Sequence, residues 1–124
     1  MSTTPGTIPA SEALALDSLI APTEGGIASR VLAKTGGGNV TLFAFDQGQG
    51  LSEHTAPFDA LVIVLDGELA LTVGGQAVTA LPGTIVRLPA NLPHAVDATV
   101  ASRMLLVMLR EPKADSPAGA APPA

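Results

Sequence analysis

Short β-favouring runs separated by turn signals dominate the middle of this chain. Each run is rich in Val, Leu, Ile and Thr, and the separators include TGGG, DG, GG and PG. The runs cover residues 27–34, 39–45, 60–65, 69–73, 76–81, 84–88, 94–98 and 103–110. Strands at this spacing, with no helical segment between them, are typical of an all-β sandwich or barrel.

Two of the turns predict the local arrangement of strands. Asp66-Gly67 and Gly74-Gly75 are two-residue sequences whose positive φ values suit tight hairpins, so residues 60–79 are predicted to form a three-stranded meander. Residues 60–65 are apolar on both alternating faces. One face can fill a barrel, and the other must pack on something else, for which a second copy of the chain is the simplest candidate. We therefore expect a homodimer.

The two ends of the chain differ in composition from the middle. The segment 113–124 is rich in Pro and Ala and lacks large apolar side chains, so we expect a disordered tail there. Residues 1–11 are expected to be flexible, and residues 12–112 to form the single folded domain. Within 11–20, Ser11 is a candidate cap for a helix that is short at most.

Composition excludes several classes of partner and location. Six Lys and Arg against eleven Asp and Glu give a net charge of −5, which repels a phosphate backbone, so no nucleic-acid partner is expected. The chain has no Cys, hence no disulfide framework or thiolate site. The start of the chain does not read as a signal peptide, and no apolar run approaches the ~20 residues of a membrane span. These features predict a soluble, cytoplasmic protein that does not bind membranes.

Two spaced sets of Gly, Pro and His residues resemble the two characteristic motifs of the cupin family of small β-barrels. The first set is Gly48, His54 and Gly67, and the second is Gly83, Pro89 and His94. The context from "SEHTAPFDALVIVLDG" to "LPANLPHAV" is similar to small single-domain cupins that are mostly uncharacterised. The resemblance implies an antiparallel cupin-like β-barrel, also called a jelly roll or double-stranded β-helix, and it implies that cofactors, where present, are divalent metals.

The chain departs from the family pattern at the positions where metal ligands stand. The second His of the first motif falls on Ala56, its Glu on Ala60, and the Asn of the second motif on Ala98. Asp59 is one residue early, and a one-residue offset in a strand turns the side chain to the opposite face. Asp59 is therefore predicted to point out of the barrel.

His54 and His94 are the only two histidines, and a cupin-like barrel places the ends of their strands side by side. Two imidazoles at one barrel mouth can bind a divalent transition metal, or act as acid and base near a pKa of about 6.5. Catalytic sites usually have three protein ligands, so two alone predict a weak, exchangeable site. Candidate third ligands at the same mouth are Glu53, Gln47, Gln49 and Asn91.

Other interpretations of these histidines remain open at this point. They can be remnants that hydrogen-bond each other, a backbone carbonyl or water, which the alanines at ligand positions favour. Metal-free acid–base chemistry of the kind found in sugar epimerases needs a tyrosine, and the chain has none. Met104 and Met108 share one face of the last run and either line a ligand cavity or fill gaps in a core poor in aromatics. Arg87 and Arg103 are expected on the outer face, in solvent.

Two functions of different class follow from these patterns. The first is a binding module in which the barrel holds a small-molecule ligand at a mouth built around His54 and His94, with or without a divalent metal. The second is a metal-dependent cupin enzyme, such as an oxygenase or isomerase of a small organic substrate.

Overall fold

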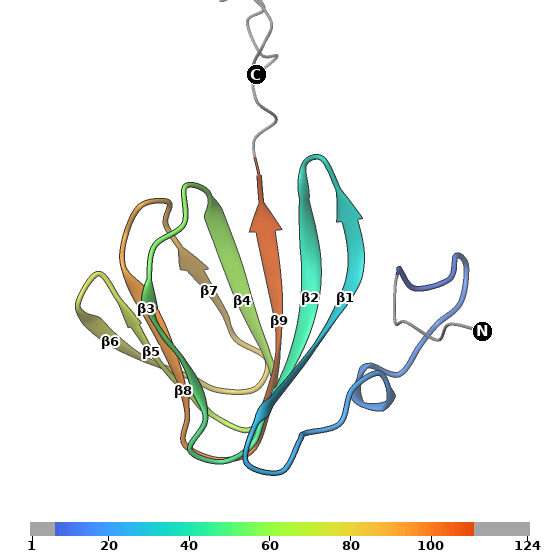
Figure 1. Ribbon diagram of the computed structural model, residues 1–124, viewed down its shortest axis with the longest axis horizontal. Coiled ribbons are helices and arrows are strands. Elements are labelled where there is room, and N and C mark those ends of the chain that lie inside the picture. Colours follow the sequence, from blue (N-terminus) through green and yellow to red (C-terminus); the bar gives the residue numbers. More distant parts are fainter. Residues whose placement is uncertain (1–6, 111–124) are drawn as a thin grey trace, which may run out of the picture.

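The computed structural model describes residues 7–110, which form two antiparallel β-sheets packed face to face (Figure 1). The five-stranded sheet has the order β1 (Ile27–Thr35), β2 (Gly38–Phe45), β9 (Ser102–Leu109), β4 (Asp59–Asp66) and β7 (Ile85–Leu88). The four-stranded sheet has the order β3 (Gly50–His54), β8 (His94–Ala98), β5 (Leu69–Val73) and β6 (Gln76–Ala80). The predicted all-β, antiparallel barrel is confirmed.

The core lies between the two sheets and is almost entirely aliphatic. Alternate residues of β4, including Val62 and Val64, meet Leu69 and Leu71 of β5 across this interior, and all four are at most 1 % exposed. Burying one such side chain stabilises the fold by about 1.5–3 kcal/mol. The strict alternation in β4 leaves its odd-numbered residues on the outer face of the five-stranded sheet.

The predicted meander over residues 60–79 is wrong in its first half. β4 pairs with β7 and β9, whereas β5 pairs with β6 and β8, so the Asp66-Gly67 turn carries the chain from one sheet to the other. Both edges of β4 are already occupied, and the Glu68 N–H bonds to Ser102 Oγ instead of to β4. The second turn is a hairpin as predicted: Val73 pairs with Gln76, and Gly74 and Gly75 have φ values of 57° and 83°.

One strand and one helix differ from the sequence prediction. The eight predicted strands are present, but the edge strand β3 was missed because Leu51 is the only large apolar residue in its five positions. The predicted short helix is reduced to a single 3-10 turn at Leu16–Ser18, and Ser11, with φ of 64°, does not cap it. Within residues 7–110 no helix is long and apolar enough to cross a membrane.

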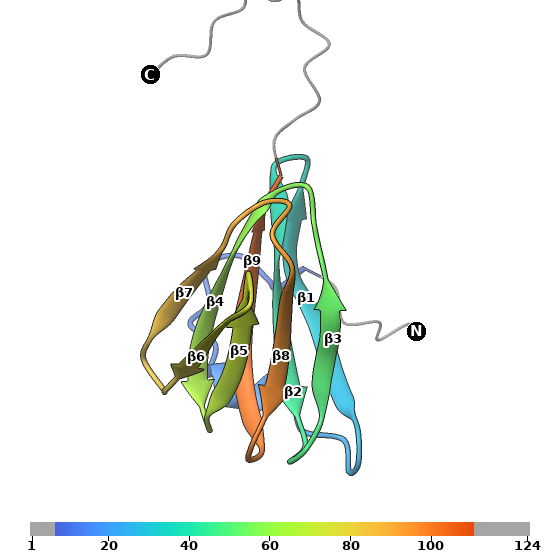
Figure 2. The ribbon, with the colours of Figure 1, turned by 90° about the vertical axis from the view of Figure 1, so that its left-hand side faces the viewer.

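The segment before β1 runs along the outer face of the five-stranded sheet (Figures 1 and 2). Arg30 and Arg103, from β1 and β9, donate to the Leu19 and Ile20 carbonyls. Between them the outward-facing Leu42 and Ala44 of β2 are fully buried. The expected flexibility of residues 1–11 and the boundaries of the domain stay predictions, and the expected tail at 113–124 lies outside the described residues.

Candidate functional site

β3 ends and β8 begins at the same end of the barrel, which we call the mouth (Figure 2). The last residue of β3 is His54 and the first of β8 is His94. They are register partners, and their rings meet edge to face with centroids 4.4 Å apart. A bulge in β3 makes this pairing possible. Leu51 pairs with Val96 and His54 pairs with His94, so the chain advances three residues along β3 over the length of two residues on the antiparallel β8. Because the extra residue reverses the alternation, Leu51 and His54 lie on the same side of β3, where Leu51 packs against the core and the His54 ring contacts His94.

Hydrogen bonds to the backbone orient both rings. Nδ1 of His54 lies 2.9 Å from the Ser52 carbonyl oxygen, and Nδ1 of His94 lies 3.2 Å from that of Leu92. A carbonyl oxygen only accepts, so each Nδ1 carries the proton in this arrangement. Each neutral ring therefore keeps a free lone pair on Nε2. Such an Nδ1–H bond to a carbonyl is the usual support of a metal-ligating histidine.

The two histidines differ in environment. His94 is 6 % exposed, on the same face of β8 as the core residue Val96, while His54 at the end of an edge strand is exposed. Burial lowers the pKa of His94 and the neighbouring His54 lowers it further, against an opposing effect of the Leu92 carbonyl. His94 is therefore neutral, and its Nε2 is free to bind a metal, over a wider pH range than an ordinary histidine.

This lowered pKa predicts a specific dependence of stability on pH. Unfolding restores the ordinary His94 pKa of about 6.5, so below that pH the unfolded chain binds more protons and the free energy of unfolding falls. The stabilisation that comes from keeping His94 neutral is complete above pH 6.5, and it is lost as the pH falls through the lowered pKa of His94 in the folded chain. Urea unfolding followed from pH 8 to pH 5 should show this loss in the wild type, and a His94→Gln variant should lack it. If the free energy of unfolding changes equally with pH in both proteins, the lowered pKa of His94 is not the cause of the pH dependence.

Asp59 holds the loop that carries His94. Its Oδ1 accepts the Ala90 N–H at 2.8 Å and its Oδ2 bonds to Arg87 at 2.9 Å, and these bonds lower the Asp59 pKa. The same loop is tied to the β3–β4 connection by Asn91 N–H to the Ala56 carbonyl, at 2.7 Å. Asp59 thus points out of the barrel, as predicted, but its bond to the loop could not be predicted from the sequence.

Removing this carboxylate should loosen the His94 loop. We expect Asp59→Ala to weaken metal binding by about tenfold, the lower end of the range for groups that orient ligands. Arg87→Ala is the matched control, since it removes the exposed ion pair but leaves the Ala90 bond, and its affinity should stay near the wild-type value. Titration calorimetry with Zn²⁺ measures both. If the two variants lose the same affinity for Zn²⁺, the Ala90 hydrogen bond is not what holds the loop.

The remaining candidate ligands do not gather around the histidines. Among residues 7–110 no three His, Cys, Asp or Glu side chains form a cluster that could hold a metal. Gln47 and Gln49 were wrongly expected at the mouth: the Gln49 carbonyl accepts the N–H of Ala98, and Ala98 lies four residues beyond His94 at the far end of β8. Glu53 is exposed next to His54, and Asn91, with φ of 64°, forms a turn.

The alanines at ligand-motif positions line the barrel without polar groups. Ala60 and Ala98 are 5 % and 2 % exposed in the core, while Ala56 is half-buried and contributes its carbonyl to the Asn91 bond. None of these three alanine side chains can serve as a metal ligand.

The methionines and arginines are distributed as follows. Met104 is fully buried in the core, and Met108, on the same face of β9, is half-buried opposite Ala60. Arg87 and Arg103 lie on the outer face, where they form ion pairs with Asp59 and Asp66 at 2.9 Å. The outer position expected for both arginines is thus observed.

Comparison with known proteins gives one consistent result. The profile of the Cupin domain family matches residues 41–109, more than half of the chain. A conserved protein of unknown function from Streptococcus pyogenes is similar in structure, with a TM-score of 0.80 and 28 % identity, over 89 % of this chain and 96 % of that one.

Two further solved structures carry the family in their descriptions. A cupin superfamily protein from Desulfitobacterium hafniense has a TM-score of 0.79 and 30 % identity, over 85 % of this chain and 96 % of that one. A Cupin 2 conserved barrel domain protein from Leptotrichia buccalis has a TM-score of 0.72 and 38 % identity, over 75 % of this chain and 45 % of that one. No similar protein was found among the curated proteins. The profile match, the shared barrel and the two motif histidines together show that this chain belongs to the cupin domain family.

Proposed function

We propose that His54 and His94 bind one divalent transition-metal ion through their Nε2 atoms, and that this centre holds a small organic molecule at the mouth of the barrel. The observation that carries the proposal is the pair of Nδ1–carbonyl bonds, which leaves both Nε2 lone pairs free on neighbouring rings. Imidazole suits zinc, copper, nickel and iron, so the donor set fits a first-row metal.

The electrostatics of the pair support the same function. The pKa of His94 is lowered by burial and by His54, so protons compete less with a metal ion for His94. In the absence of a metal, protonating both rings would place two positive charges at a centroid separation of 4.4 Å, which is unfavourable. A metal ion shared between two neutral rings avoids this repulsion.

The alanines favour a ligand that brings its own oxygens. Ala60 stands where a carboxylate would neutralise part of the charge of the ion, and its neighbours on the inner face are apolar. A bound metal would supply Lewis acidity and open coordination positions there. A small molecule with an anionic oxygen donor would complete both the coordination and the charge balance.

Titration of tag-free protein with Zn²⁺ tests the metal part of this function. We expect one ion per chain, with affinity that falls in acid, because protons compete with the metal for the imidazole nitrogens. A Glu53→Gln variant is the matched control, since its side chain lies next to His54 in sequence but on the exposed side of β3, and it should bind as the wild type does. Protein that takes up no ion at neutral pH would refute the proposal.

A further inference from the structure

Two polar residues of β2, Asn39 and Thr41, lie on the inner face of the barrel. Asn39 pairs with Met108 of β9, and Met108 pairs in turn with the core residue Ala60 of β4. Residues directly opposite each other on neighbouring strands share one face of a sheet, so Asn39 faces the interior, and so does Thr41 two residues further along β2. The metal centre proposed above uses neither of them.

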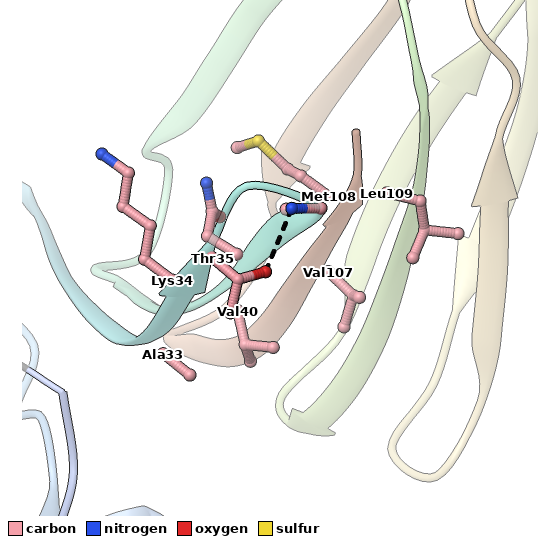
Figure 3. Close-up of a pocket in the computed structure, with 10 residues that line it drawn as sticks. Ala33, Lys34, Thr35, Val40, Val107, Met108 and Leu109 are labelled. Atoms are coloured by element: carbon pink, nitrogen blue, oxygen red, sulfur yellow. Dashed lines mark hydrogen bonds between the residues drawn. The ribbon is translucent and has the colours of Figure 1, made fainter. Parts of the chain in front are cut away.

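A lysine of the edge strand lies on the same face of the sheet. Lys34 of β1 is the register partner of Asn39. In Figure 3, Lys34 and Met108 point to one side of the sheet, whereas Ala33 and Val40 point to the other. The register therefore places Lys34, Asn39 and Met108 in one row across three neighbouring strands.

We call this row, continued onto β4, the mouth row: Lys34, Asn39, Met108 and Ala60. It lies at the same end of the barrel as the histidines, because only the short β3–β4 connection separates β4 from His54. Lys34 is exposed, and Asn39 and Met108 are half-buried. Deeper in the barrel, Met104 on the same face of β9 is fully buried. A small molecule can therefore reach the mouth row but cannot pass far beyond it.

Thr41 determines which end of the Asn39 amide is available to a ligand. The Thr41 hydroxyl donates to Oδ1 of Asn39 at 3.2 Å, and Thr41 is only 7 % exposed. Because this bond engages the oxygen of the amide, the two N–H groups of Nδ2 are available to another acceptor. The ammonium group of Lys34 also only donates. A carboxylate, which only accepts, is the group that suits two neighbouring donors, one of them charged.

We propose that Asn39 and Lys34 bind a second carboxylate of the molecule held at the metal, so that the ligand is a short-chain dicarboxylate with one carboxylate at each end. This inference rests on the proposed function. Sheets packed face to face are about 10 Å apart, and Figure 1 shows the two sheets diverging toward the mouth. A molecule that reaches from the histidines on one sheet to Asn39 on the other therefore needs a binding group at each end. The apolar side chains of Met108 and Ala60 suit its carbon chain.

The charges at the mouth also suit a ligand of this class. A divalent ion on two neutral imidazoles carries two positive charges, and a dicarboxylate carries two negative ones. Lys34 adds a further positive charge at the far end of the ligand. Asp59, next to Ala60 in sequence, does not oppose binding, because it points out of the barrel and pairs with Arg87 at 2.9 Å.

Titration calorimetry of the full chain loaded with Zn²⁺ tests this contact. The probe is glutarate, and the control is pentanoate, which has the same carbon chain but a single carboxylate. The wild type should bind glutarate about tenfold more tightly than pentanoate or better, as expected for charge-assisted hydrogen bonds to the second carboxylate. Asn39→Leu should lower the affinity for glutarate by about tenfold and leave the affinity for pentanoate unchanged. Lys34→Gln should have a smaller effect in the same direction, because Lys34 is exposed.

A second variant, Asn39→Asp, keeps an oxygen acceptor for Thr41 and replaces only the N–H donors, so it should lose the preference for glutarate without disturbing the strand. All variants should bind Zn²⁺ as the wild type does. A wild type that binds Zn²⁺ but does not prefer glutarate, or variants at Asn39 that keep the preference, would overturn this second contact and leave the metal site intact. A wild type that takes up no Zn²⁺ would overturn both proposals.

Discussion

Gly67→Ala should destabilise the fold by about 4 kcal/mol, a large part of the 5–15 kcal/mol typical of a domain. Gly67 has φ of 83°, a left-handed conformation that disfavours side chains. A Cβ there would lie 2.5 Å from the Ala101 carbonyl oxygen and 2.6 Å from Ser102 Cα, and closer still to Ser102 Oγ. These are backbone and buried atoms, so the crossing between the sheets must shift.

The displacement would also break hydrogen bonds. Ser102 is 1 % exposed, and its Oγ accepts the Glu68 N–H at 2.9 Å and lies 2.8 Å from the Val100 carbonyl oxygen. Moving Ser102 away leaves a partly buried N–H without its acceptor, which adds to the loss. The midpoint of urea unfolding, followed by circular dichroism, measures the total effect.

Gly75→Ala is a closely matched control for this prediction. Gly75 has the same φ of 83°, but a Cβ there would meet no atom within 4 Å. Its substitution should cost only the backbone strain, about 1 kcal/mol. If Gly67→Ala and Gly75→Ala lose the same stability, the tight crossing at Ser102 does not constrain the fold as the contacts indicate.

His54→Ala should lower the affinity for Zn²⁺ by more than about 100-fold while changing the stability little. A whole ligand is lost from a two-ligand site, which exceeds the 10–100-fold effect of losing an outer-shell partner. His54 is exposed at the end of an edge strand, so few packing contacts are lost. Titration calorimetry and urea unfolding of the same variant separate the two effects.

His94→Ala is the informative comparison. It should lower the affinity for Zn²⁺ by a similar factor, but it should also destabilise the chain, because His94 is 6 % exposed on the inner face of β8. A His54→Ala variant that binds Zn²⁺ as the wild type does would show that His54 is not a ligand, whatever the behaviour of His94.

Most of the fold could be predicted from the sequence, because its signals are local. The alternation in 60–65 and the glycine pairs define strands and turns through backbone preferences alone. β4 and β5 were predicted to pair with each other, and they do not. A two-residue turn with Gly shows that the chain changes direction, but not whether the two strands that it joins pair with each other or with other strands. β3 was missed because an edge strand with one apolar residue has no periodic signal.

The candidate site could also be predicted only in part from the sequence. The proximity of His54 and His94 could be predicted from motif spacing, and the register confirms it. Their orientation could not, because it depends on a bulge in β3 and on the Ser52 and Leu92 carbonyls. The role of Asp59 depends on a backbone N–H 31 residues away, a contact with no signature in sequence.

Electron paramagnetic resonance of the protein loaded with Cu²⁺ tests the two-histidine site most directly, because the spectrum counts the nitrogen nuclei bound to the metal. The wild type should show hyperfine splitting from two equivalent imidazole nitrogens, and His54→Ala should show splitting from one. A wild-type spectrum with one nitrogen or none, or one that His54→Ala leaves unchanged, would contradict a metal shared between His54 and His94.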